Sequence, residues 1–116
     1  MKTYIVYGRS NSEYASGMVS KPQNRIDVVK PMLDQFNIKI REFLFTSSES
    51  FNFFSIVEAE NDSDVEALSA VVFSSGTWDS MHWSRAYESQ EYKEIYEKAH
   101  DGVNSYVTSM QLAGDG

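Results

Sequence analysis

The side chain best suited to acid–base chemistry in this chain is His82, one of two histidines. It stands among Trp78, Met81 and Arg85, which share one face if the segment is helical. Imidazole titrates close to physiological pH, so it could act as general base toward a phenol or an activated methylene. The alternative is a half-buried packing histidine. His100 lies near the expected C-terminus of a helix, where the helix dipole favours a cation.

No residue pattern indicates a metal site or a covalent nucleophile. The chain has no cysteine, and its two histidines stand far apart without carboxylates at a ligand spacing. Asp62 and Asp64 are expected to cap a helix, because acids favour its N-terminus. The serine pairs at 47–48 and 74–75 form no nucleophile elbow and have no partner histidine at a telling spacing. We therefore expect no metal and no cofactor.

Aromatic residues are the more informative feature, since seven Phe, seven Tyr and two Trp exceed what one small core needs. A small-molecule site is usually an apolar pocket with few polar groups. We expect such a pocket for a largely hydrophobic ligand with one polar end. Its predicted lining consists of Tyr4, Phe45, Phe54, Trp78, Trp83, Arg85 and Tyr87. The alternative is that these side chains form only the core and a dimer interface.

The charge balance narrows the choice of partners. Ten basic residues face seventeen acidic ones, which gives a formal net charge of −7. The basic residues are scattered singly, whereas nucleic-acid binding needs a clustered positive surface. The N-terminal residues lack the apolar core of a secretory signal, and no segment is apolar enough to span a bilayer. We expect a soluble, cytoplasmic protein that binds neither nucleic acid nor membranes.

The N-terminal third is expected to hold a strand, a loop and a helix. Residues 4–7 form a β-branched and aromatic run that predicts a buried strand. The polar residues 9–23 predict a long loop, of the kind that often acts as a lid. An apolar stripe at helical spacing predicts a helix over 24–37, with Asn37 as its left-handed terminator and a kink at Pro31.

The middle of the chain predicts a β-hairpin. Residues 38–45 alternate in part between apolar and charged side chains, and residues 51–57 are almost continuously apolar. The five residues between the two runs have the composition of a turn. Two strands with a short polar connection form an antiparallel pair, and this is the clearest local prediction.

The C-terminal half is expected to be helical until its last strand. Residues 61–76 predict a helix that Gly76 ends, and residues 79–102 suit two further helices that meet near Glu88. Residues 103–112 alternate in polarity and predict a final strand, followed by a frayed tail at 113–116.

This order of elements, β-α-β-β-α-β, predicts one α+β domain over residues 1–116 with a ferredoxin-like antiparallel sheet. Helices can cover only one face of such a sheet. Residues 51–57, however, carry apolar side chains on both faces, which an antiparallel sheet with one wet face should not. A second copy of the chain is the simplest cover. We therefore expect a homodimer in which two sheets form an α/β barrel.

With these features the chain resembles the dimeric α/β-barrel superfamily, in which two ferredoxin-like sheets pack face to face. The hairpin resembles that of the GYD-domain family, because Thr46 and the Glu-Ala pair at 58–59 fit its pattern. Residues 50–52 stand where that family has its Gly-Tyr-Asp triplet, and none of the three is kept. The segment 78–92, ending in Glu-Ser-Gln-Glu-Tyr, is instead similar to the antibiotic-biosynthesis-monooxygenase-like branch.

The two branches differ in the position of the fourth strand. A GYD-like register implies a strand over 77–85 with a helix after it. We favour residues 103–112, because Asp79 and Ser80 are poor strand formers.

The resemblance also implies a function. Related cofactor-free monooxygenases and cyclases place an ionisable or polar group between sheet and helices, and His82 matches it in type and rough position. Arg85 or Tyr87 would assist, and the 9–23 loop would close the site. Ligand binding without catalysis stays open. So does a second class of function, a non-catalytic assembly or regulatory module whose aromatic residues serve only dimer contacts.

Overall fold

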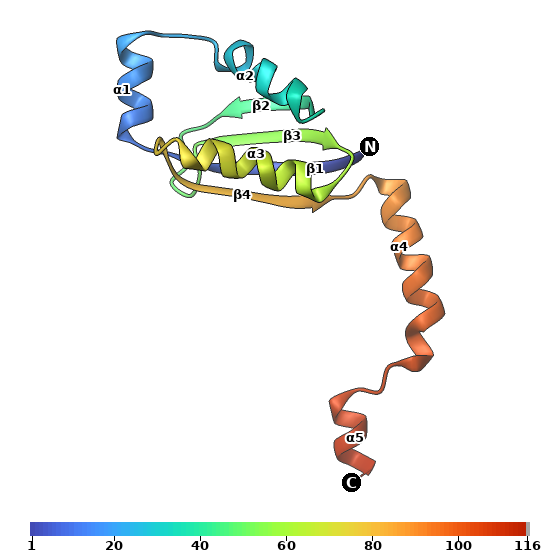
Figure 1. Cartoon of the computed structure of the whole chain (residues 1–116). Coiled ribbons are helices and arrows are strands. Elements are labelled where there is room, and N and C mark those ends of the chain that lie inside the picture. Colours follow the sequence, from blue (N-terminus) through green and yellow to red (C-terminus); the bar gives the residue numbers. More distant parts are fainter. Residues whose placement is uncertain (116) are drawn as a thin grey trace. The chain divides into compact units, whose positions relative to one another are not determined.

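Four antiparallel strands form one open sheet in residues 1–86, the first of two units into which the chain divides. The computed structural model describes residues 1–115. Along the sheet the order is β2 (Lys39–Phe45), β3 (Phe53–Ala59), β1 (Lys2–Ser10) and β4 (Trp78–Ala86). The unit is therefore an α+β structure, and this arrangement is compatible with a ferredoxin-like fold (Figure 1).

Three helices complete this unit. They are α1 (Ser12–Ser20), α2 (Arg25–Gln35) and α3 (Asp62–Ser74). The residue Gly76 follows α3 with φ at 78°, in the left-handed region that glycine adopts without steric cost, and the chain then turns into β4. After α2, Asn37 plays the same part with φ at 55°, as the sequence predicts.

The second unit, from Tyr87 onward, is helical. It holds α4 (Ser89–Gly102), a short 3₁₀ turn η1 (Val103–Ser105) and α5 (Ser109–Asp115). Among the described residues, no helix combines the length and apolar character needed to cross a membrane.

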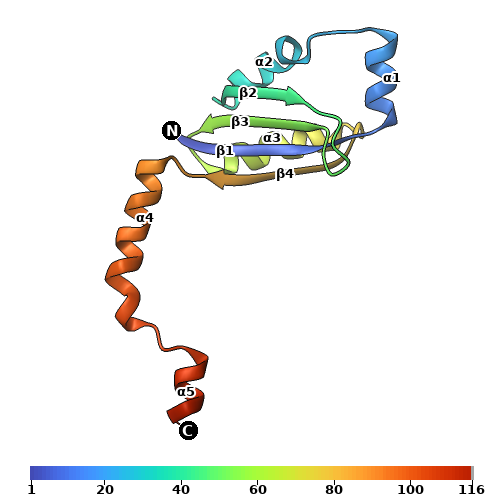
Figure 2. The ribbon, with the colours of Figure 1, turned by 180° about the vertical axis from the view of Figure 1, so that it is seen from behind.

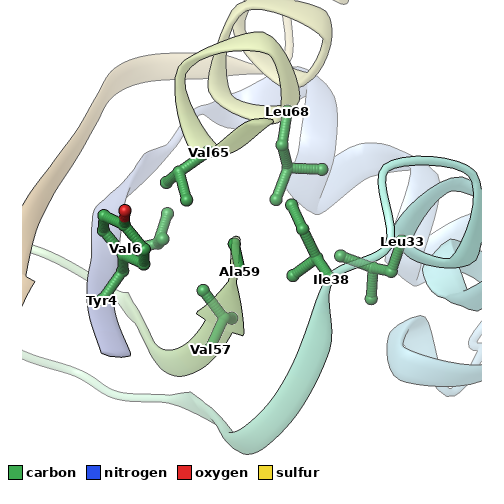
Figure 3. Packing of buried hydrophobic residues seen from close by; sticks show 8 residues of the cluster. All are labelled: Tyr4, Val6, Leu33, Ile38, Val57, Ala59, Val65 and Leu68. Carbon is green, nitrogen blue, oxygen red and sulfur yellow. The ribbon is translucent and has the colours of Figure 1, made fainter. Parts of the chain in front are cut away.

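The core lies between one face of the sheet and the helices α2 and α3 (Figure 3). Alternate residues of the two central strands point into it, because successive side chains of a strand face opposite ways. Leu33 of α2 and Leu68 of α3 approach this face from the helix side. The complete buried cluster consists of Tyr4, Val6, Leu33, Ile38, Val57, Ala59, Val65 and Leu68.

The opposite face of the sheet is covered by no helix of residues 1–86, as Figure 2 shows. Its centre is nevertheless apolar. Ile5 lies across from Ile56, and Tyr7 lies across from Phe54, in the pairing of β1 with β3. This set of four half-buried side chains is referred to below as the uncovered face.

Two irregularities in the strand pairing decide which side chains reach the helix side. In β2 the register shifts at Arg41, so Ile40 and Phe43 face the same way although they are three residues apart. In β4 the extra residue is Asp79, and it brings Trp78 and Met81 to the helix side in the same way.

Several predicted elements are confirmed. The hairpin is present as β2 and β3, and the predicted helices over 24–37 and 61–76 are present as α2 and α3. Pro31 lies inside α2. The helix predicted to end at Gly102 is α4.

The prediction of the last strand is wrong. The fourth strand is Trp78–Ala86, close to the GYD-like register. Residues 103–112 form the 3₁₀ turn, a short irregular stretch and the start of α5. The region 9–23, expected to be a loop, contains α1. The predicted tail at 113–116 belongs to α5 as far as Asp115, and Gly116 lies outside the described residues.

Candidate ligand-binding site

A cavity of about 450 Å³ lies between α2, α3 and the helix side of the sheet. It exists because α2 packs on β2 while α3 packs on β3 and β4, so that neither helix fills the space between them. Its size falls within the range of small-molecule pockets, roughly 300–1,000 Å³. The lining consists of Val6, Tyr14, Arg25, Val28, Val29, Met32, Leu33, Ile40, Phe43, Phe45, Phe53, Ser55, Val57, Leu68, Ser69, Val71, Val72, Ser75, Thr77, Trp78 and Met81.

One end of the cavity is a cluster of aromatic rings. Phe53 contacts Phe43 and Trp78 with ring centroids 5.0 and 5.4 Å apart, both nearly edge to face. Tyr14 adds a further edge contact to Trp78 at 5.2 Å. Edge-to-face pairs of this kind fix ring orientations as well as burying area. The aromatic end is therefore a shaped wall against which an apolar molecule can pack.

Helix α1 contributes Tyr14 to this wall, and Asn11 fixes the start of the helix. The Asn11 side-chain oxygen accepts hydrogen bonds from the backbone amides of Glu13 and Tyr14, at 3.0 and 3.3 Å. Its amide group donates to the carbonyl of Gly76 at 2.8 Å, and its backbone N–H donates to that of Thr77 at 3.0 Å. No residue of α1 is fully buried. The helix is thus held at its N-terminus and by the Tyr14 ring.

The cavity opens to solvent along an apolar rim. Val28 of α2, Phe45 of β2 and Val71 of α3 line it while remaining 51%, 49% and 47% exposed. Because these side chains stay half exposed around one opening, the rim leaves apolar surface in contact with water. This rim is where a ligand would enter.

Polar groups are few in the walls. The Ser55 hydroxyl is buried and donates to the Val6 carbonyl at 3.0 Å. Ser69 is 6% exposed, and its hydroxyl has no hydrogen-bond partner among the described residues. A buried hydroxyl without a partner costs free energy. A serine hydroxyl turns about one bond, so a polar group in the cavity could satisfy it without movement of α3.

Arg25, the first residue of α2, is the one charged side chain of the lining. Its guanidinium lies 5.7 Å from the centroid of the Tyr14 ring and donates from Nη1 to the Gln23 side-chain oxygen at 2.6 Å. Burial raises the pKa of the Tyr14 phenol, and the nearby Arg25 charge opposes that rise. The lining contains no carboxylate and no imidazole.

The structure separates the residues that were predicted to share a pocket. Phe45 and Trp78 line the cavity. Tyr4, Trp83 and Arg85 form a different cluster at the other end of the sheet: the Trp83 ring lies edge-on to Tyr4 at 5.7 Å, and the Arg85 guanidinium lies 5.6 Å from the Tyr4 ring centroid.

This second cluster is tied to its surroundings by hydrogen bonds. The Tyr4 hydroxyl donates to Asp62 at 2.5 Å, the Trp83 indole donates to Glu66, and Arg85 donates to the Thr3 carbonyl at 3.2 Å. Burial, then the hydrogen bond to Asp62, raise the pKa of the Tyr4 phenol to about 12. These contacts are structural, and none of the three residues lines the cavity.

His82 lies in a strand and not in the predicted helix. It pairs across β1 with Tyr7, and the two rings are 5.5 Å apart beside the uncovered face. Phe54 belongs to that face as well. Tyr87 lies in the second unit, where its ring stacks on Tyr92 at 6.2 Å. His82, Phe54 and Tyr87 are therefore not part of the cavity lining.

The sequence prediction missed the polar residues of the lining, of which Arg25 and Ser69 lie on helices. Arg25 stands four residues before Val29, so helical spacing puts both on one face of α2. Ser69 similarly stands four residues after Val65 on the apolar face of α3. In both helices, a polar residue at helical spacing from the apolar stripe could have indicated that its side chain faces the sheet.

No family model matches the chain, no curated protein matches it, and no solved structure matches it. Among the described residues, no group of three or more His, Asp or Glu side chains could hold a metal ion.

Proposed function

We propose that this protein binds a small, largely apolar molecule in the cavity between α2, α3 and the sheet. The observation that carries the proposal is the cavity itself, which is about 450 Å³ in volume and has an aromatic end wall and an exposed apolar rim. An apolar hollow of this size that opens at an exposed rim is the form that small-molecule sites take. Filling it would bury apolar surface at no cost in chain entropy.

Binding without catalysis is the version that the lining supports best. General acid–base catalysis needs an ionisable group within hydrogen-bond reach of the reacting atoms. The lining offers Tyr14 and Arg25 but no histidine, carboxylate or lysine. The oxygenase or cyclase chemistry implied by the resemblance would therefore need a different base from His82, which lies beside the uncovered face.

We further propose that two copies pair through their uncovered faces, as ferredoxin-like sheets do in an α/β barrel. Ile5, Tyr7, Phe54 and Ile56 support this, since they form an apolar strip across β1 and β3 that no helix of residues 1–86 shields. A second copy would cover this strip and leave each cavity, on the opposite face of the sheet, open to its ligand.

The two tryptophans allow a direct test, because one lines the cavity and the other does not. In the Trp83→Phe variant all tryptophan emission comes from Trp78, and in Trp78→Phe it comes from Trp83. We expect decanoate or 1-decanol to shift or quench the emission of the first variant and to leave that of the second unchanged. Isothermal titration calorimetry on the unmodified protein measures the same binding without substitution.

A cavity-filling pair of variants supplies the control. Val29→Phe places a larger side chain in the cavity, and we expect it to weaken binding of both probes. Val19→Phe makes the same change on α1 at a side chain that is 81% exposed and outside the lining, so binding should not change. If neither probe binds the unmodified protein, or if both variants bind equally well, the proposed function is wrong.

A second candidate is a non-catalytic assembly or regulatory module. One observation favours it: α4 carries an exposed apolar stripe, with Tyr92 and Tyr96 49% and 59% exposed, in addition to the uncovered face. Such surfaces suit contacts between proteins. This candidate predicts an oligomer whose Trp78 emission does not respond to small amphiphiles.

A further inference from the structure

We infer that the molecule bound in this cavity is an amphiphilic anion, whose carboxylate or similar group pairs with Arg25 while its apolar part fills the space between α2 and α3. The inference rests on the proposed function and narrows it to one ligand charge. Its basis is the juxtaposition of a single cation with an otherwise uncharged cavity.

Arg25 has donors to spare for such a ligand. A guanidinium carries five N–H groups. Arg25 donates one hydrogen bond to Gln23 and lies over the Tyr14 ring, and it also interacts with the Tyr14 hydroxyl. In the part of the chain that the structure describes, Arg25 forms no ion pair with a carboxylate. Its charge is half-buried and incompletely paired at the edge of an apolar space.

The position of Arg25 on α2 strengthens the preference for an anion. It is the first residue of an 11-residue helix, where backbone amides lack helical partners and the helix dipole adds positive potential. The cap residue Asn24 makes no side-chain hydrogen bond to these amides. Two acids stand close in sequence or space: Asp27 lies in the first turn of α2, and Glu13 shares a smaller hollow with Arg25.

A planar guanidinium binds a carboxylate through two parallel hydrogen bonds, which fixes orientation as well as charge. A carboxylate held at Arg25 would direct the attached chain past Tyr14 toward the aromatic wall and the Ser69 hydroxyl. Nothing in the lining would repel it, because the lining holds no acid. A cationic amphiphile would be repelled by Arg25 and would find no acid in the lining to pair with.

The test compares two ligands that differ only in their polar group, decanoate and 1-decanol. We expect the unmodified protein to bind decanoate more tightly at pH 7. In Arg25→Gln, which removes the charge but keeps a polar side chain, decanoate affinity should fall about tenfold, while 1-decanol affinity should change less than twofold. Arg25→Lys should retain part of the preference for decanoate over 1-decanol. Lysine keeps the positive charge but lacks the planar pair of donors that a guanidinium offers to a carboxylate.

Lys21→Gln is the matched control, since it removes a nearby positive charge that does not line the cavity. It should leave both affinities unchanged, and thermal unfolding midpoints should show that each variant folds. If Arg25→Gln weakens both ligands equally, or neither, the charge inference fails although the proposed function stands. If the unmodified protein binds neither ligand, both fail.

Discussion

Gly8 is the residue at which the sheet leaves the least room for a side chain. A Cβ at this position would lie 2.3 Å from the carbonyl oxygen of Ser80, which belongs to the backbone of β4. Backbone in a paired strand cannot give way as a flexible side chain would. The Gly8 carbonyl also accepts a hydrogen bond from the Asn52 amide at 3.0 Å, which holds β1 from its other side.

We therefore expect Gly8→Ala to lower the free energy of unfolding by about 2 kcal/mol or more, measured by urea denaturation. Gly17→Ala is the control. Gly17 lies in α1, where an added Cβ would meet no atom within 4 Å apart from its own helix backbone and chain neighbours. Alanine is also favoured over glycine inside a helix by up to about 1 kcal/mol. Equal stability of the unmodified protein and Gly8→Ala would show that β4 adjusts freely at Ser80.

Tyr4 gives the core a defined response to alkaline pH. Its pKa is about 12 in the folded protein, against about 10 for an unfolded tyrosine. The folded state therefore holds this proton more tightly than the unfolded state. The resulting stabilisation is fully present below pH 10 and is lost as the pH rises through 12.

Tyr4→Phe should remove this dependence. We expect the free energy of unfolding of the unmodified protein to fall more steeply between pH 10 and pH 12 than that of the variant, since other tyrosines contribute equally to both. Guanidinium titrations at several pH values in this window provide the measurement. Parallel slopes for the two proteins would mean that the hydrogen bond to Asp62 does not retain the phenolic proton.

Among the elements, α1 is held at its N-terminus by the Asn11 side chain. The Asn11 side chain bonds two amides of the first turn of α1 and the carbonyl that follows α3. Asn11→Ala should cost about 1 kcal/mol. The loss should be local, because α1 buries no residue completely. We expect faster amide hydrogen exchange over residues 12–20, with little change in the strands.

Asn24→Ala is a control of the same kind, because Asn24 occupies the N-cap of α2 without making a side-chain capping bond. It should leave hydrogen exchange in α2 nearly unchanged. Equal protection of α1 in Asn11→Ala and the unmodified protein would mean that the Tyr14 ring and the backbone bond from residue 11 to Thr77 hold this helix without the Asn11 side chain.

The elements also show how far sequence reasoning reaches. The hairpin could be predicted because β3 is apolar along its length and a clear turn precedes it. The strand β4 was missed because Asp79 and Ser80 are poor strand formers, whereas in the structure Asp79 is the extra residue of a bulge and Ser80 pairs with Arg9. Residues 103–112 alternate better, but alternation alone does not make a strand without a neighbour to pair with.

The type of candidate site could be predicted from the sequence, but most of its lining residues could not. Composition favoured an aromatic pocket, and Phe45 and Trp78 do line the cavity. Which other aromatics join them depends on the faces of the strands. Arg85 was placed in the pocket by helical spacing and Trp83 by the surplus of aromatic residues. In the strand β4 both side chains belong to the cluster around Tyr4. The spacing of residues along the chain does not tell which face of the sheet a side chain occupies or which helix packs against that face.

At the scale of the whole molecule, the uncovered face is the surface on which oligomerisation can be tested. If two copies pair through this face, a charge at its centre should separate them, because an unpaired charge in an apolar interface is costly. We expect Ile56→Glu to shift sedimentation equilibrium from dimer toward monomer. Val19→Glu, on the exposed surface of α1, should not. An unmodified protein that sediments as a monomer would contradict the proposed dimer.

The extra residues at Arg41 and Asp79 have a consequence for polymerisation. Both lie in the outermost strands, β2 and β4, whose free edges could otherwise recruit further strands and lengthen the sheet into a fibre. A bulge interrupts the regular row of amides and carbonyls along such an edge and twists it, and charged side chains there add to the obstacle. These two bulges therefore oppose growth of the sheet along its outer strands. The pairing proposed above, through the uncovered face, would then end at a closed pair and not continue into a fibre.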